Sequence, residues 1–187
     1  MEEVVLLDDS GLAIGSAPKD RVHTRETPLH LAFSCYVLDR AGRLLLSRRA
    51  VTKQTWPGVW TNSFCGHPAP GEALEAAVQR RAETELGFDV TGIEMALPDF
   101  RYRAVDHSGV VENELCPVLI AATSCEVTPN PDEVGQVAWV ELENFESALS
   151  LVPFAFSPWS TMQFPKIADR LRVRRRSLLE SSESPPS

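Results

Sequence analysis

The sequence predicts a single domain of the α+β class, or an α/β sandwich with a mixed sheet. The chain has 187 residues, of which 43% are hydrophobic, and this is enough for one buried core but short for two ordinary domains. Residues 72–86 follow a helical pattern, and strand patterns lie both before and after them. A helix flanked in sequence by strands is typical of a sheet and helices packed in one unit.

The first expected elements are two apolar-rich strands, residues 30–38 and 43–47. The segment between them, Asp39 to Gly42, has the composition of a turn. We therefore expect a β-hairpin at this point of the chain. The acidic segment before it carries no motif, and solvated surface is the favoured interpretation.

The clearest element is a helix over residues 72–86. Alanines and Val78 recur there among charged residues at the spacing of an amphipathic helix. Gly87 stands where the C-terminal cap of such a helix belongs, because glycine readily adopts the left-handed conformation that ends many helices.

Three further strands are expected over residues 99–105, 112–122 and 136–141, separated by Asp/Gly and Pro-Asn-Pro-Asp turns. A second helical pattern begins at about Pro158 and leads into a run of arginines. The segment 176–187 is expected to be disordered, because its polar Ser, Glu and Pro residues cannot bury enough surface to order it.

The single domain is thus expected over residues 1–175, with its core at about residues 23–160. A formal net charge of −8 argues against a nucleic-acid partner, since binding to a phosphate backbone depends on a surplus of Lys and Arg. No apolar run is long enough for a membrane span, and the acidic start is unlike a secretory signal. We expect a cytoplasmic monomer with no membrane partner.

One candidate site is the segment Thr61 to Pro68, which carries Cys65 and His67. These two side chains share one face if the segment is extended. A thiol beside a metal or a cationic group loses its proton more readily than an ordinary cysteine, which makes it usable for proton transfer. The other interpretation is a structural cysteine. None of the four cysteines has CxxC spacing, and reduced thiols are expected.

A second candidate is the pair Glu112 and Glu114, which leads into an apolar strand. In a strand the two carboxylates point the same way, as shared binding of a divalent cation or a metal-tuned acid/base requires. His23, His30 and His67 lie beside the segments already singled out, and imidazoles with carboxylates form a ligand set for Mn, Zn, Fe or Mg. Spacing alone leaves open a solvent-facing strand end and surface histidines.

The segment 66–88 is similar to the Nudix box, a loop-helix-loop that in its family holds divalent metals on helix carboxylates against a diphosphate. The glycines, the helix length and Glu85 fit that pattern. Where the pattern has Arg-Glu this chain has Arg80-Arg81, and where it has Glu-Glu this chain has Thr84-Glu85. Fewer carboxylates and an added cation favour holding a diphosphate over cutting it.

The run from Trp56 to Pro68, with residues 100–103 (Phe-Arg-Tyr-Arg) and 112–114 (Glu-Asn-Glu), strongly resembles the type I isopentenyl-diphosphate isomerase family of the Nudix superfamily. The resemblance extends from about residue 23 to residue 159. It implies a Nudix-like mixed β-sheet sandwiched between α-helices. It also implies interconversion of isopentenyl and dimethylallyl diphosphate, a step of isoprenoid biosynthesis, by protonation and deprotonation.

The resemblance implies a divalent metal, Mn, Zn or Mg, bound by His23, His30, His67, Glu112 and Glu114. It implies a second ion, Mg2+, between Glu85 and the diphosphate of a small-molecule prenyl substrate. It implies Cys65 and Glu114 as the acid/base pair on opposite faces of the alkene, with Tyr102 hydrogen-bonded to Glu114. The basic positions that match those holding the diphosphate are Lys19, Arg49, Lys53 and Arg81.

The chemistry of such a reaction sets a further requirement. Protonation of an unactivated double bond gives a tertiary carbocation, which water would trap. The site therefore has to be dry and has to face the cation with a π surface. Trp159 is the candidate for that surface, and core packing is the alternative for the same residue.

Two other functions compete with the isomerase. A Nudix hydrolase would cleave a nucleoside or prenyl diphosphate without needing Cys65, and the depleted box argues against it. A binding module on a Nudix fold would have no turnover, and the intact Cys65, Glu85, Glu114 and histidines argue against that.

Overall fold

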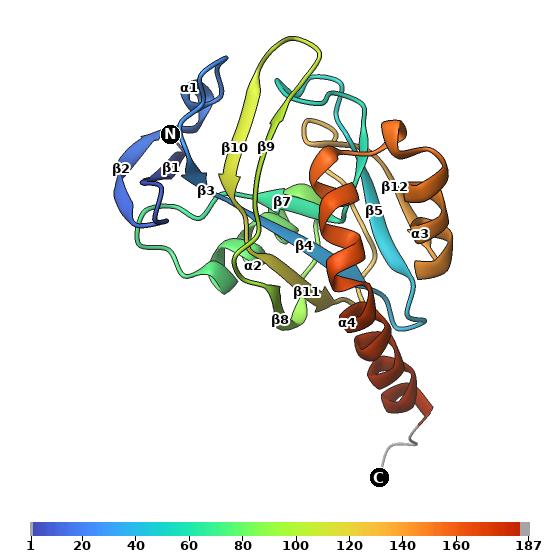
Figure 1. The fold of residues 1–187 in the computed structure, drawn as a ribbon. Helices are drawn as coiled ribbons and strands as arrows, with labels where there is room; N and C mark the ends of the chain where they lie inside the picture. Colours follow the sequence, from blue (N-terminus) through green and yellow to red (C-terminus); the bar gives the residue numbers. More distant parts are fainter. Residues whose placement is uncertain (1, 184–187) are drawn as a thin grey trace.

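The computed structural model describes residues 2–183, which form two β-sheets and the helices packed on them (Figure 1). In the larger sheet the strand order is β12-β5-β4-β11-β8. Its β4 (Phe33–Leu38) and β11 (Val118–Ala122) are parallel, and the other neighbours are antiparallel. The remaining strands of this sheet are β5 (Leu44–Arg49), β8 (Thr91–Leu97) and β12 (Val134–Val140). The expected mixed sheet is confirmed.

The smaller sheet has the order β2-β1-β3-β10-β9. Its strands are β1 (Glu3–Leu7), β2 (Ala13–Pro18), β3 (His30–Leu31), β9 (Arg101–Val105) and β10 (Val111–Leu115). The N-terminal segment, expected to be plain surface, is therefore a β-hairpin, followed by α1 (Lys19–Val22). Most of β2 is exposed, and the sequence consequently shows no apolar alternation there.

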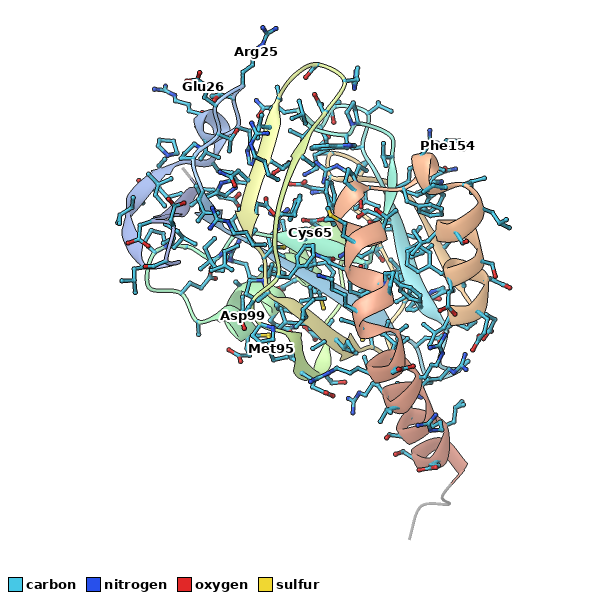
Figure 2. All side chains as sticks on the ribbon, viewed as in Figure 1. Arg25, Glu26, Cys65, Met95, Asp99 and Phe154 are labelled. Atoms are coloured by element: carbon cyan, nitrogen blue, oxygen red, sulfur yellow. The ribbon has the colours of Figure 1, made fainter. Side chains whose placement is uncertain are left out.

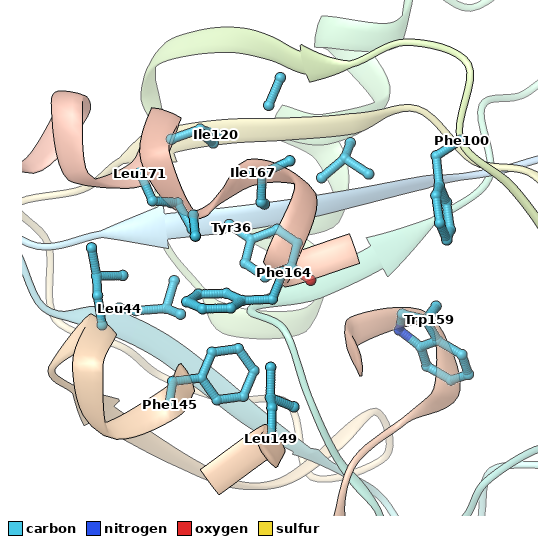
Figure 3. Close-up of a cluster of buried hydrophobic side chains, with 14 of the residues drawn as sticks. Tyr36, Leu44, Phe100, Ile120, Phe145, Leu149, Trp159, Phe164, Ile167 and Leu171 are labelled. Carbon is cyan, nitrogen blue, oxygen red and sulfur yellow. The ribbon is translucent and has the colours of Figure 1, made fainter. Parts of the chain in front are cut away.

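Helices cover both faces of the larger sheet. Successive β4 residues point to opposite faces, so Phe33 and Val37 pack with α2 (Leu74–Leu86). Tyr36 faces α3 (Leu142–Leu151) and α4 (Pro158–Glu183), as Figure 3 shows for Phe145 and Phe164. The predicted sandwich is confirmed, although the sequence interpretation did not include α3.

The segment from β6 (Trp60–Thr61) to β7 (Phe64–Gly66) separates β4 from β5. The expected hairpin pairs β4 with β5 only at Leu38 and Leu44. Beyond that pair β6 bonds to β5 and β7 bonds to β4. We call residues 60–66 the wedge segment, because they fill the space between two diverging strands.

The predicted strand over residues 112–122 is two strands, β10 and β11, which belong to different sheets. They are separated by Cys116 and Pro117, and proline has no N–H to donate to a ladder. The chain crosses from one sheet to the other at this point.

The C-terminal segment also differs from the prediction. Helix α4 continues to Glu183, so residues 176–183 are helical rather than disordered, while 184–187 lie outside the described residues. Leu178 packs against the core, which supplies the burial that the polar composition did not suggest. Although α4 has 26 residues, no helix within residues 2–183 is long and apolar enough to cross a bilayer.

Gly87 ends α2 with φ 68° and a hydrogen bond from its N–H to the Glu83 carbonyl. A Cβ there would lie 2.8 Å from the Thr128 carbonyl oxygen. We expect Gly87→Ala to lower the free energy of unfolding by about 1–3 kcal/mol, from left-handed strain and this contact together. Gly71→Ala is the control in urea unfolding, since Gly71 has φ 78° with nothing within 4 Å. Equal losses in both variants would show that the Thr128 contact contributes nothing.

Candidate active site

A cavity of about 490 Å³ lies between residues of both sheets, α1, α2 and the start of α4. Apart from His30, every predicted site residue lines it: Lys19, His23, Arg49, Lys53, Cys65, His67, Arg81, Glu85, Tyr102, Glu112, Glu114 and Trp159. His30 is fully buried and pairs with Glu114 across β3 and β10. Figure 2 shows Cys65 near the centre of the molecule.

Three histidines and a glutamate converge at one point of this cavity. One ligand atom from each of His23, His30, His67 and Glu114 lies within 4.8 Å of the others. The residues come from separate elements: His23 ends α1, His30 opens β3, His67 follows β7, and Glu114 lies in β10. The parallel pairing of β3 with β10 brings His30 opposite Glu114.

The donor atoms of this cluster fit a metal ion. His23 Nε2, His30 Nε2, His67 Nδ1 and Glu112 Oε2 are buried without a hydrogen-bond partner among the described residues. An unpaired buried polar atom costs about 1–3 kcal/mol, and a cation held among these atoms would remove that cost. His30 Nδ1 lies 3.0 Å from the Pro28 carbonyl, and donating there leaves the Nε2 lone pair facing the cluster.

The cluster also fixes the ionisation of its members. Burial alone would raise the pKa of Glu114, but the neighbouring imidazoles of His30 and His67 lower it well below its usual range. Burial lowers the pKa of His67 to about 4. Burial opposes the charged form of His30 too, yet Glu114 raises its pKa overall. Glu114 is therefore a carboxylate at neutral pH, as a metal ligand has to be.

Glu112 lies at the edge of the cluster, with Oε2 3.0 Å from His23 Nε2. Its other oxygen accepts a hydrogen bond from the Thr55 hydroxyl at 2.6 Å. Arg49 in turn donates to the Thr55 carbonyl at 2.9 Å. The sequence interpretation gave no role to Thr55, because no spacing signal connects it to a residue 57 positions later.

Tyr102 and Cys65 line the same cavity as Glu114. The Tyr102 hydroxyl donates to Glu114 Oε2 at 2.9 Å, and the two residues are paired across β9 and β10. Burial raises the pKa of Tyr102 well above its usual value, so the phenol remains a donor. Burial also raises the pKa of Cys65 to about 12. The more acidic thiol expected from the sequence does not follow from the protein groups alone, since desolvation dominates.

Three of the predicted basic side chains, Lys19, Lys53 and Arg81, are matched by carboxylates in the cavity lining. Lys53 pairs with Glu133, and Arg81 lies 3.4 Å from the same residue. Lys19 lies 2.5 Å from Glu2, which is also 3.5 Å from Arg81. Neither Glu2 nor Glu133 was predicted, because no motif marks them. A bound diphosphate would compete with these carboxylates for the cations.

Both arginines of the segment similar to the Nudix box have structural partners. Arg80 donates to Glu72 at 2.8 Å and to the His67 carbonyl at 3.2 Å. Arg81 is buried and pairs with Glu85 four residues later. Glu85 lies outside the histidine cluster and lines the cavity together with Arg81. The one arginine that replaces a box glutamate, Arg81, therefore leaves Glu85 in the cavity lining.

Trp159 lines the cavity and also packs in the core. The residue is 2% exposed and stands at the margin of the cluster drawn in Figure 3. Its ring lies 5.9 Å from that of Tyr102 and 5.5 Å from that of Trp56. The Arg49 guanidinium lies 5.4 Å from its centroid, which shows that the indole face accepts a cation.

Comparison with known sequences gives consistent matches. The pattern of the NUDIX domain family matches residues 28–159. The isopentenyl-diphosphate Delta-isomerase of Clavibacter michiganensis subsp. michiganensis is 60% identical over 164 residues, covering 88% of this chain and 84% of that protein. The isopentenyl-diphosphate Delta-isomerase of Paenarthrobacter aurescens is 56% identical, covering 90% of this chain and 91% of that protein.

Comparison with solved structures supports the same fold. The protein DR0079 from Deinococcus radiodurans superposes with a TM-score of 0.69 at 14% identity, covering 89% of this chain and 99% of that chain. A MutT protein from Methanosarcina mazei superposes with a TM-score of 0.62 at 19% identity, covering 76% and 95%. At these identities the likeness concerns the arrangement of helices and strands alone.

Proposed function

The chain belongs to the Nudix superfamily and, within it, to the isopentenyl-diphosphate Delta-isomerases, and from this premise we propose how its residues divide the reaction. The enzyme interconverts isopentenyl and dimethylallyl diphosphate. The observation that supports the division is the convergence of Cys65, Tyr102, Glu114 and Trp159 on one cavity.

Cys65 and Glu114 are proposed as the acid/base pair. In one direction a proton is added to the terminal methylene carbon, which leaves a tertiary carbocation at the neighbouring carbon. A proton then leaves the carbon on the other side, and the double bond forms there. Because the reaction is reversible, the acid and the base exchange roles with its direction.

Tyr102 and Trp159 are proposed to assist this pair. Tyr102 holds Glu114 Oε2, while His30 and His67 lie within 3.5 Å of Oε1, so both carboxylate oxygens are oriented. Trp159 presents a π face to the carbocation and helps to exclude water. These contacts orient the groups that exchange protons before the substrate arrives.

The histidines with Glu112 and Glu114 are proposed to hold a divalent ion, Mn, Zn or Mg. Such an ion, when bound, supplies positive charge that fixes Glu114 and tunes its proton affinity. We propose Lys19, Arg49, Lys53 and Arg81, which line the same cavity, as the groups that bind the diphosphate. Glu85 is proposed to share a Mg2+ ion with that diphosphate.

The Thr55 hydroxyl is expected to orient Glu112 for metal binding. Because partners of metal ligands typically change affinity by roughly 10- to 100-fold, Thr55→Val should weaken metal binding by that factor. Competition with a chromophoric chelator measures it, after the resident metal has been removed. Thr84→Val makes the same chemical change on an exposed turn of α2 and should leave the affinity unchanged. Equal affinity in both variants would rule out a role for the Thr55 hydrogen bond.

The reaction is tested by incubating the enzyme with isopentenyl diphosphate, Mg2+ and Mn2+ in deuterated water. NMR should show dimethylallyl diphosphate carrying deuterium, with no release of phosphate in the same tube. Release of phosphate without a shift of the double bond would support the hydrolase. The monomeric state and the cytoplasmic location stay predictions, and light scattering after size-exclusion chromatography tests the first.

A further inference from the structure

We propose that Asn62 is a positioning residue that fixes the Cys65 thiol and the Trp159 indole relative to each other, an inference that rests on the roles proposed above. Asn62 is fully buried in the wedge segment. Its Oδ1 accepts hydrogen bonds from Cys65 Sγ at 3.4 Å and from Trp159 Nε1 at 3.0 Å. A single oxygen atom thus joins the thiol to the indole.

The orientation of the Asn62 amide is determined by its other end. Nδ2 donates to the carbonyls of Cys35 at 3.0 Å and Phe64 at 2.8 Å. Both amide hydrogens are therefore used, and a flipped amide would place its oxygen against two carbonyl oxygens. Oδ1 must face Cys65 and Trp159 as an acceptor.

A third hydrogen bond connects the same oxygen to the start of α4. The Thr61 hydroxyl donates to Asn62 Oδ1 at 2.8 Å and lies 2.8 Å from the Ser157 hydroxyl. Because the single hydroxyl proton of Thr61 is directed to Asn62, the Ser157 hydroxyl is the donor in its contact with Thr61. This chain of donors ties the helix that carries Trp159 to the segment that carries Cys65.

Ser34 holds the same sulfur from the core. Ser34 Oγ lies 3.3 Å from Cys65 Sγ and accepts a hydrogen bond from Gln163 Nε2 at 3.0 Å. The Tyr36 hydroxyl donates to Gln163 Oε1 at 3.2 Å, and Ser34, Tyr36 and Gln163 are each fully buried. Because its members are buried in the core, this network holds the sulfur in place.

The geometry predicts a specific kinetic effect. The reacting carbons have to lie against both the thiol and the indole, and a displacement of about 1 Å in such a site lowers the rate on the order of 100-fold. We expect Asn62→Ala to lower kcat by roughly 10- to 100-fold. KM should change less, because the cations proposed for the diphosphate do not contact Asn62.

Ser63→Ala is the matched control for a purely structural role. Ser63 is the next residue of the wedge segment and is also fully buried. Its hydroxyl accepts from the Val37 N–H at 2.8 Å and donates to the Leu45 carbonyl at 2.7 Å. It supports both diverging strands, and neither contact involves the proposed acid/base pair. We expect Ser63→Ala to unfold at lower temperature with kcat close to that of the wild type.

Tryptophan fluorescence gives a readout that does not depend on turnover. Loss of the hydrogen bond to Nε1 should change the emission of Trp159 in Asn62→Ala. In a Trp159→Phe background, the Asn62→Ala substitution should leave the tryptophan emission unchanged. A change that persists in that background would come from another tryptophan and would count against the inference.

Asn62→Asp separates the positioning role of Asn62 from its role in stability, because the two roles predict opposite effects relative to Asn62→Ala. It keeps an acceptor oxygen for Cys65 and Trp159 but loses both donors to the Cys35 and Phe64 carbonyls. We expect Asn62→Asp to be less stable than Asn62→Ala and yet to have the higher kcat at a temperature where circular dichroism shows both folded. A lower kcat than that of Asn62→Ala would overturn the inference.

Two further outcomes keep the test decisive. If Asn62→Ala does not fold, Thr61→Val removes one donor to the same oxygen, and an unchanged kcat and emission in that variant would overturn the inference. Identical kcat in Asn62→Ala and Ser63→Ala would also overturn the inference. The proposed function would stand in that case, because the wild type remains active. An inactive wild type supplied with metal would instead count against the proposed function.

Discussion

Replacing Cys65 with alanine is expected to lower kcat for isomerisation by roughly 10²- to 10⁴-fold, the usual contribution of a general acid or base. The variant loses the group proposed to exchange a proton with one face of the alkene. KM should change little, because the side chains proposed to bind the diphosphate are other residues of the cavity lining. Deuterium incorporation into dimethylallyl diphosphate measures the loss directly.

Cys125→Ala controls for the removal of a thiol, since Cys125 is an exposed free cysteine outside the cavity. It should match the wild type in rate and in deuterium incorporation. A Cys65→Ala variant that remains folded and retains more than about a tenth of the wild-type kcat would exclude Cys65 from the acid/base pair.

Glu114→Gln should combine two losses that Cys65→Ala does not. The side chain keeps its shape but loses both its negative charge and its ability to exchange a proton, so kcat should fall by roughly 10²- to 10⁴-fold. The metal should also bind more weakly, by more than the roughly 10- to 100-fold typical of an outer hydrogen-bond partner. Chelator competition and the NMR assay measure these two effects on one preparation.

Glu126→Gln is the control for this charge change, because Glu126 is exposed and lies outside the cavity. It should leave both the metal affinity and kcat unchanged. Normal metal affinity in Glu114→Gln would mean that the three histidines bind the ion without this carboxylate. Normal kcat would remove Glu114 from the acid/base pair.

The sequence predicted those features that rest on local patterns. The amphipathic spacing of α2 and its Gly87 cap were predicted within two residues of their observed bounds. Glu112 and Glu114 face the same way because side chains alternate along β10. The histidines could be singled out by their positions beside these segments, but spacing alone left surface histidines open, because their clustering depends on the pairing of β3 with β10.

The features that were missed depend on contacts between distant segments. Asn62 lies within the motif that carried the resemblance, yet its role depends on a hydrogen bond to Trp159, which is 97 positions away. Glu133 is defined by its pairs with Lys53 and Arg81. The division of residues 112–122 between two sheets depends on tertiary packing, although Pro117 could have signalled the break.

The divergence of β4 from β5 has a consequence for how the protein acquires its structure. One edge of β4 forms its ladder of hydrogen bonds with β11, which pairs in parallel. This edge stays open until β11 has been translated, about 80 residues later. Trp159 and Gln163 arrive later still, so the Asn62 network stays incomplete on a nascent chain until α4 has left the ribosome. Pairings of such long sequence separation form slowly. We therefore expect C-terminally shortened translation products to expose an open strand edge and to be prone to aggregation.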